Sequence, residues 1–505
     1  MKRQVINAAR VELDDIQGLV RFAFKHHTEA VFLLLRVKDA SAARAWLARV
    51  TVTNAVDCDP LPATVLQVGL TSEGLRALGV DAAVVNAFSA EFVAGIAGDP
   101  SRSRRLGDLG PSDPSLWLWG TGERTPHVVV LLYALPGQLP EMRRTVEAQC
   151  AAGFQTLAEL PTSDMGGIEP FGFVDGISQP DLDWSRQLPA RDSTHLAYLN
   201  LICLGELLLG YPNEYGLYTP RPLLDPARDA VAILPRAEDA HDRADLGRNG
   251  TYLVIRQLRQ DVHGFWQALD RYAAGSASER QLLAAAIVGR TLSGEPLEPI
   301  VATGITPGAG TDVRQSQLNA FGYLSDPEGI RCPLGAHVRR ANPRTADVPP
   351  GARGIFSRLA RILGFNATAR RQDLVASERF HRLLRRGREY GSALTPEQAL
   401  TGSPDGADRG LQFICLGANL QRQFEFVQGA WLMNARFDGL RDEGDPLLGN
   451  RRADAAPKPT DCFSVPQPSG PCRRLTSLPQ FVTVAGGAYF FLPGIRALRF
   501  LSGAR

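Results

Sequence analysis

The sequence predicts an α+β protein made of two similar halves. Short apolar runs typical of buried strands are mixed with segments typical of helices, without the regular alternation of a doubly wound parallel sheet. A comparable order of segments occurs before residue 150 and again after residue 195. The runs TVLQVGLTSEGL and LQFICLGANLQRQ, which begin at Thr64 and Leu411, are also loosely alike. These observations favour a duplicated unit, but they do not give the order of the strands.

The first half is expected to contain strands and helices in the order strand, helix, strand, helices, strand, helix. The predicted strands are AVFLLLRV, TVLQVGLT and HVVVLLYA. The predicted helices are ASAARAWLARV, SEGLRALG, VDAAVVNAFSAEFVAGIAG and QLPEMRRTVEAQCAA. Between them, GDPSRSRRLGDLGPSDPS is rich in Gly, Pro, Ser and Asp, and this composition predicts a loop.

The second half repeats this order with longer interruptions. LAYLNLICLG, TYLVIRQL and LQFICLGA are predicted strands, and QDVHGFWQALDRYAAG, SERQLLAAAIVGRTL and LQRQFEFVQGAWLMN are predicted helices. Pro/Gly-rich or polar stretches at 210–250, 300–328, 391–410 and 441–472 are functional or insertional loops. Segment 345–380 is strongly basic, which fits either an amphipathic helix that meets membranes or acidic partners, or a solvated insertion.

The length, net charge and cysteine count of the chain are those of an ordinary folded protein. Its 505 residues allow two or three domains, and its net charge of +2 gives no reason to expect a nucleic-acid partner. The seven cysteines are scattered without a CxxC pair, which argues against a zinc ribbon and favours a reducing compartment. The acidic N-terminal region does not resemble a signal peptide, and no run reaches the roughly 18 apolar residues of a membrane span. We therefore expect a cytoplasmic protein.

The segment CPLGAHVRRANPR, from Cys332 to Arg344, has a histidine between small residues and arginines. Imidazole is a common ligand of haem iron, and small neighbours allow a flat partner to come close to His337. Arg339, Arg340 and Arg344 have the fork that suits carboxylates such as haem propionates. The alternative is a histidine satisfied at the start of a helix, with arginines that face water.

Four segments, in order along the chain, resemble the dye-decolorizing peroxidase family in its larger bacterial type. They are GFVDG with Asp175, CPLGAHVRRANPR with His337, LLRRGREYG with Arg385, and LQFICLGANLQRQFEFVQGAW from Leu411. The likeness runs from DIQG at Asp15 to AYFFLPG near the end. It implies two ferredoxin-like domains, residues 1–170 and residues 171–505, with the haem pocket in the second.

The resemblance also implies the ligands of the cofactor. His337 would bind the haem iron, and Asp445 would accept a hydrogen bond from the other nitrogen of its ring. Arg339 and Arg340 would contact the propionates. For Asp445 the alternative is a turn residue before proline. His381, four residues before the predicted active-site arginine, is a lesser candidate for a propionate contact or a plain surface role.

On the open face of the iron, the resemblance implies that Asp175 moves a proton and Arg385 stabilises developing charge. Arg385 is preferred to Arg382 and Arg386 by alignment on the following Tyr-Gly pair. Leu411 and Phe413 would form the apolar roof of the pocket. Without the resemblance, Asp175 reads as a turn residue, and the two apolar side chains read as ordinary core.

The expected function is therefore that of a haem peroxidase that reduces hydrogen peroxide and oxidises organic donors such as dyes and phenols. Because CxxCH is absent, one haem b per chain would be bound without a covalent link. A haem carrier or sensor, or a protein that releases iron from haem, is the alternative. The Asp175–Arg385 pair discriminates between them, since a carrier needs no proton relay.

Overall fold

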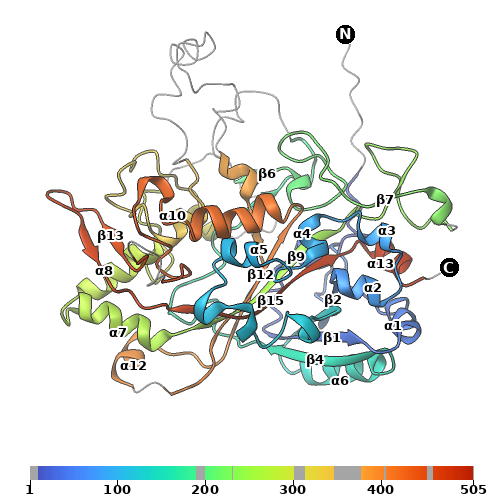
Figure 1. Cartoon of the computed structure of the whole chain (residues 1–505), viewed down its shortest axis with the longest axis horizontal. Coiled ribbons are helices and arrows are strands. Elements are labelled where there is room, and N and C mark those ends of the chain that lie inside the picture. Colours follow the sequence, from blue (N-terminus) through green and yellow to red (C-terminus); the bar gives the residue numbers. More distant parts are fainter. Residues whose placement is uncertain are drawn as a thin grey trace, which may run out of the picture.

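One antiparallel sheet runs through the protein and joins two units of similar topology (Figure 1). The computed structural model describes residues 10–188, 200–229, 231–300, 313–345, 377–402, 405–451 and 459–503. In these ranges the strand order of the sheet is β10-β12-β9-β15-β2-β3-β1-β4, and β11 also pairs with β12. All the strand pairs of this sheet are antiparallel, which places the two halves side by side in one layer.

The first unit has the strand order β2-β3-β1-β4, which is that of a ferredoxin-like fold. Its strands are β1 (Glu29–Val37), β2 (Thr64–Leu70), β3 (Val128–Ala134) and β4 (Phe154–Pro161). Its helices are α1 (Ala40–Leu47), α2 (Ser72–Ala77), α3 (Ala82–Val85), α4 (Ala90–Ala94), α5 (Pro100–Leu106) and α6 (Leu139–Cys150). The three strands expected in this half are confirmed, and β4 was not foreseen.

The second unit has the corresponding order β10-β12-β9-β15. Its strands in the large sheet are β9 (Thr251–Gln260), β10 (Leu384–Arg385), β11 (Arg388–Tyr390), β12 (Gly410–Gly417) and β15 (Val482–Leu492). Its helices are α7 (Val262–Tyr272), α8 (Ala277–Val288), α9 (Val313–Leu318), α10 (His337–Ala341), α12 (Pro396–Thr401) and α13 (Ile495–Leu501). The predicted helix after β12 consists of two π-helical segments, η10 (Gln421–Glu425) and η11 (Val427–Leu432).

The α+β class and the two ferredoxin-like units are thus confirmed. The domain boundary at residue 170 stays a prediction; it falls in the connection between β4 and β9. Among the described residues, this connection and the later loops contain three small sheets. They pair β5 (Asp181–Leu182) with β6 (Leu201–Ile202), β7 (Leu223–Leu224) with β8 (Ala244–Asp245), and β13 (Phe463–Val465) with β14 (Arg473–Leu475).

Two expectations about local structure need correction. The segment predicted as a loop contains α5, because Asp99 accepts a hydrogen bond from the Ser101 amide at 2.8 Å and Pro100 is tolerated in the first turn of a helix. The long helix expected over 80–98 is two short ones, α3 and α4, because Ser89 caps a new start. Most of the basic segment 345–380 lies outside the described residues, as does the start of the strand expected at LAYLNLICLG.

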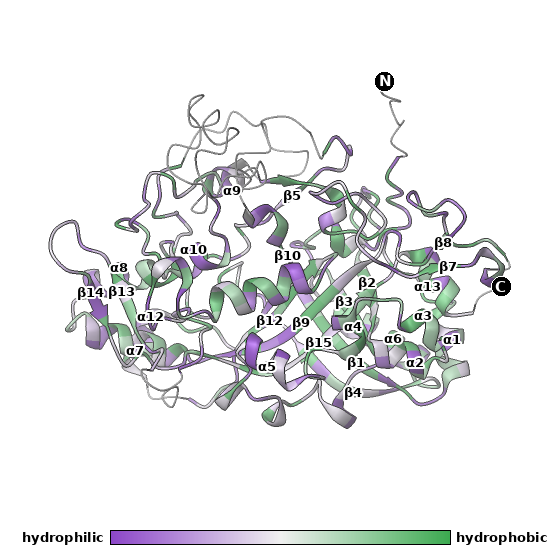
Figure 2. Ribbon diagram, turned by 45° about the horizontal axis from the view of Figure 1, so that its top comes forward, coloured by the Kyte–Doolittle hydropathy of each residue, from purple (hydrophilic) through white to green (hydrophobic). Residues whose placement is uncertain are grey.

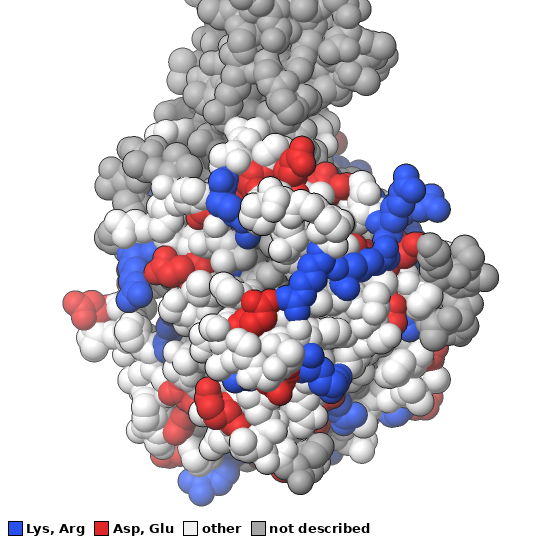
Figure 3. Space-filling view, turned by 90° about the vertical axis from the view of Figure 1, so that its left-hand side faces the viewer, with Lys and Arg blue, Asp and Glu red and all other residues white. Residues whose placement is uncertain are grey.

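The two units share one hydrophobic core. β15 meets β2 through the pair Phe491↔Leu70, and the ring of Phe88 lies 4.9 Å from that of Phe491. Phe88 comes from the first unit, whereas Phe491 and the buried Tyr252 come from the second. Figure 2 shows that the central strands are mostly hydrophobic. On the face seen in Figure 3, acidic and basic side chains are interspersed, in keeping with the small net charge.

Candidate active site

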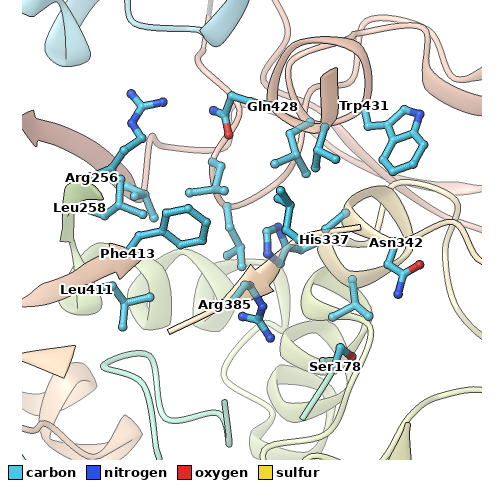
Figure 4. A pocket seen from close by; sticks show the side chains of 18 of the residues that line it. Ser178, Arg256, Leu258, His337, Asn342, Arg385, Leu411, Phe413, Gln428 and Trp431 are labelled. Carbon is cyan, nitrogen blue, oxygen red and sulfur yellow. The ribbon is translucent and has the colours of Figure 1, made fainter. Parts of the chain in front are cut away.

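A cavity of about 250 Å³ opens mainly among residues of the second unit, between the sheet, α10 and the π-helical segments, and Leu106, Gly107, Asp108 and Ser112 of the first unit also line it. Its walls come from segments far apart in the sequence, including the loop before β5, the end of β9, β10, β12 and η11 (Figure 4). Most of the lining is apolar, with a few polar groups that converge on the same space. Those relevant here are Glu169, Asp175, Ser178, Arg290, His337, Asn342, His381, Arg382 and Arg385.

His337 is the first residue of α10 and lies on the wall of this cavity. The preceding residues are small for a steric reason: a Cβ on Gly335 would come within 3.3–3.4 Å of Phe463 and Glu443, and Ala336 is fully buried. Nδ1 of His337 lies 3.0 Å from Oδ2 of Asp445. Because Asp445 takes the hydrogen on Nδ1, the lone pair of the neutral ring lies on Nε2, the atom available to a metal.

Asp445 is held in place for this contact. Its other carboxylate oxygen accepts hydrogen bonds from the amides of Leu447 and Leu448, at 2.9 and 2.8 Å. Burial by itself raises the pKa of Asp445 and lowers that of His337, but their mutual attraction outweighs burial. The pKa of the acid is therefore below its ordinary value, and the pKa of the imidazole is above it. Asp445 is thus both a turn residue and the partner of His337.

Asp175 and Arg385, which are 210 residues apart in the chain, meet at the same cavity. Nη1 of Arg385 donates to Oδ1 of Asp175 at 2.9 Å. Gly172 and Gly176 have φ values of 102° and 77°, so glycine permits the bends that turn the acid inward. Burial raises the pKa of Asp175, but Arg385, the Gly176 amide and His337 lower it more, which keeps the carboxylate ionised.

Leu411 and Phe413 are adjacent inward positions on β12, and both line the cavity. Gln412 points to the opposite side of the strand and is fully buried there. Figure 4 shows both side chains on the same side of the pocket as Leu258 of β9, with His337 at its centre and Trp431 beyond. Both apolar side chains therefore line the cavity, and their role as the roof of a haem pocket stays a prediction.

The arginines that follow His337 do not support the expected propionate contacts, because their donors point elsewhere. Arg339 donates to the carbonyls of Asp326 and Cys332, and Arg340 donates to those of Trp431, Glu443 and Asn434. Their exposed fractions are 1% and 0%. Arg344 is equally buried and donates to the carbonyls of Asn319 and Phe321. These guanidinium groups fix the loops behind the cavity rather than line it.

Further basic side chains line the cavity, and one of them, Arg290, was not predicted. Arg290 donates to the Ser178 hydroxyl at 2.9 Å, and Arg382 donates to the side chain of Asn200 at 2.7 Å. His381 also lines the cavity and stacks on Phe426 with 3.7 Å between ring centroids. Arg290 lies outside every segment that carried the resemblance, so only the fold could reveal it. His381 and Arg382, in contrast, had been considered from the sequence.

The fold and the cavity together define a class of protein with two ferredoxin-like units and a largely apolar cavity, on which an imidazole and an acid–guanidinium pair converge. The sequence is 30% identical over 86% of its length to the multifunctional dye peroxidase DyP2 of Amycolatopsis, 82% of which is covered. It is 26% identical to the dye-decolorizing peroxidase msp1 of Mycetinis scorodonius, with 98% of this chain and 88% of the relative aligned. No family model matches the chain.

The solved structure of a fungal DyP-type peroxidase from Auricularia auricula-judae superposes with a TM-score of 0.71 at 24% identity, over 98% of this chain and 100% of that chain. A dye-decolorizing peroxidase in complex with 2,6-dimethoxyphenol superposes with a TM-score of 0.68 at 24% identity, over 97% and 100%. The chain belongs to the dye-decolorizing peroxidase family, and it is a haem-dependent peroxidase. Its place in the larger bacterial type of this family stays a prediction.

The residues of the cavity fit a haem. Apolar side chains such as Leu411, Phe413 and Val338 offer flat walls to a macrocycle, and His337 offers one ring nitrogen to iron. Arg290 and Arg382, which also line the cavity, carry positive charge that suits carboxylates. The buried side-chain oxygen of Asn342 on the cavity wall has no hydrogen-bond partner among the described residues, as expected of a group that faces a ligand.

Proposed function

We propose that His337 would hold one non-covalent haem b through Nε2, and that Asp175 and Arg385, which line the same cavity, act on hydrogen peroxide there. The observation that carries the proposal is the Asp175–Arg385 ion pair on the cavity that His337 also lines. When bound, haem supplies a centre that accepts two oxidising equivalents from peroxide and passes them singly to organic donors.

The protein contributes positioning and proton transfer. Asp445 orients His337 and increases the basicity of its free nitrogen through the hydrogen bond at Nδ1. The ionised carboxylate of Asp175 takes a proton from one peroxide oxygen and returns it to the other. The guanidinium of Arg385 donates to the oxygen on which negative charge develops. Leu411 and Phe413 exclude water beside the Arg385 guanidinium. The lower polarity strengthens the electrostatic interactions that Asp175 and Arg385 make with peroxide.

The organic donors are dyes and phenols. Relatives are named for dye oxidation, and one structural neighbour is a complex with 2,6-dimethoxyphenol. We further propose that the protein is cytoplasmic, which is supported by seven cysteines that are all free thiols. Within the described ranges, no helix has the length and apolar character needed to cross a membrane.

Stopped-flow mixing of the haem-loaded protein with hydrogen peroxide tests the roles of the pair. Asp175→Asn and Arg385→Leu are expected to bind haem normally and to react about 10²–10⁴-fold more slowly. The exposed pair Arg259–Asp408 at the end of β9 offers matched controls, Arg259→Leu and Asp408→Asn, which should react at the wild-type rate. Wild-type rates in both cavity variants would contradict the proposal and would favour a haem carrier.

A further inference from the structure

Glu169 organises the loop that carries Asp175. Its Oε2 accepts hydrogen bonds from the Phe171 amide at 3.1 Å and from the Gln260 side chain at 2.7 Å, while Oε1 accepts from the Phe173 amide at 3.0 Å. One carboxylate therefore satisfies two backbone donors of the loop tip and connects the loop to β9. Because buried amides need acceptors, this side chain replaces the backbone partners that a regular hairpin would provide.

The rest of the loop is built around this centre. The Glu169 amide donates to the Phe173 carbonyl, the Gly172 amide donates to the Glu169 carbonyl, and the Asp175 amide donates to the Gly167 carbonyl. Phe171 and Phe173 pack into the core beside Phe265 of α7, with ring centroids 4.6 and 6.5 Å away. The aromatic rings fix the tip, and the carboxylate fixes the backbone that leads to Asp175.

We propose that Glu169 is a positioning residue for the reaction with peroxide: it holds the loop in the conformation that directs Asp175 at the cavity. The inference rests on the proposed role of Asp175. Glu169 itself lines the same cavity but forms no ion pair with any residue that the structure describes, so its carboxylate acts through the loop and not through a neighbouring cation.

How firmly Glu169 holds the loop depends on whether its carboxyl group is ionised. Burial, with a smaller contribution from Asp175, raises the pKa of Glu169 to about 7, although the three donors favour the charged form. The charged groups of the surrounding elements are largely neutralised: Arg385 by Asp175, Arg256 of β9 by Asp108, and His337 by Asp445, while Arg290, which also lines the cavity, remains a cation.

A neutral carboxyl group has a hydroxyl that cannot accept as well as a carboxylate oxygen, so protonation weakens one of the three hydrogen bonds. Glu169→Gln copies the neutral form at every pH, because an amide offers one acceptor oxygen. The difference between wild type and this variant should therefore be large above pH 7 and small at pH 5.5. A purely structural defect would not follow this profile.

The test uses the haem-loaded protein and its reaction with peroxide. At pH 8, Glu169→Gln is expected to react about 10- to 100-fold more slowly than wild type, in line with the cost of misplacing a catalytic group. At pH 5.5 the two rates should converge. In the Asp175→Asn background, Glu169→Gln should add little, because it acts through Asp175. Glu397→Gln, at an exposed position of α12, is the matched control and should leave the rate unchanged.

Hydrogen exchange, measured by mass spectrometry on the peptide that spans 168–176, gives a readout independent of activity. We expect faster exchange in Glu169→Gln than in wild type at pH 8. Unchanged exchange, or additive effects with Asp175→Asn, would overturn the inference.

If Glu169→Gln does not fold, Gln260→Ala removes the connection to β9 and should show the same two effects, slower reaction and faster exchange, more weakly. A wild-type rate in Asp175→Asn alone would instead reject the proposed function, and the exchange measurement would still decide the role of Glu169.

Discussion

At the scale of single residues, the pair His337–Asp445 shows how much a local motif can predict. The small residues before His337 and the acid in the DPLLG segment are visible in the sequence, and the structure brings the two side chains to 3.0 Å. The structure directs the donors of Arg339 and Arg340 to backbone carbonyls, which the sequence could not show because it gives the direction of a long side chain poorly. Glu169 was missed because its importance lies in accepting backbone hydrogen bonds, which no residue pattern marks.

Replacement of His337 by Ala should abolish most haem binding, because the ligand that holds the iron is lost. Asp445→Asn should retain the fold but weaken haem binding about 10- to 100-fold, because the partner that orients the imidazole is weakened. Haem titration followed by absorbance measures both. Asp408→Asn, at the exposed pair with Arg259, is the control. Unchanged affinity in Asp445→Asn would show that its contact with His337 is only structural.

His381 predicts a pH dependence of stability. Burial lowers its pKa from the ordinary 6.5 to about 4. As pH falls from 6.5 to 4, the unfolded chain takes up a proton that the folded protein does not, so the free energy of unfolding decreases. His381→Phe, which keeps the stacking on Phe426, should reduce this decrease by about 1 to 3 kcal/mol. Urea denaturation at several pH values measures it; an identical pH profile in the variant would refute the assignment.

At the scale of elements, apolar runs predicted β1, β2, β3, β9 and β12 of the large sheet, because a buried strand needs a continuous run of large side chains, whereas β4 and β15 were not predicted. The short β10 and β11 escaped notice since they are two and three residues long and are defined only by their pairing with β12. Helix α5 was missed because its capping residues, Asp and Pro, also favour loops.

Gly410, at the start of β12, has a steric role that the structure makes testable. A Cβ there would lie 1.8 Å from the carbonyl oxygen of Leu258, so Gly410→Ala should displace the strand that carries Leu411. We expect a loss of about 1–3 kcal/mol in stability and weaker retention of haem. Gly444→Ala, whose Cβ would have its nearest neighbour at 3.6 Å, is the control. Thermal unfolding and haem release measure the two effects, and equal behaviour of both variants would contradict the argument.

At the scale of the whole molecule, the sequence indicated two similar halves but not how they meet. Each half has a pattern of strands that is locally determined, whereas the pairing of β15 with β2 depends on contacts between residues more than 400 positions apart. Composition and periodicity describe local segments and do not show which distant segments pair. The family resemblance supplied the ferredoxin-like topology, and the structure supplied the single sheet.

Because the two units share a core, they should unfold together. Phe491 is fully buried between Phe88 of the first unit and Tyr252 of the second. Phe491→Ala should cost about 3–5 kcal/mol and leave a single unfolding transition. Phe500→Ala, a partly buried position at the margin of this core, should cost less. Calorimetry would reveal two separate transitions if the units were independent.

The shared sheet also bears on self-association. Two separate four-stranded sheets would expose four strand edges, each able to pair with another molecule. Here β15 and β2 meet through the pair Phe491↔Leu70, and most residues of both strands are buried in the interior. Of the remaining edges, β4 ends at Pro161 and bears Glu159, which pairs with Arg143 at 2.6 Å, while β10 is two residues long. Fusion of the units into one layer thus removes half of the surfaces through which β-rich proteins aggregate, and should help the enzyme to remain dispersed at high concentration.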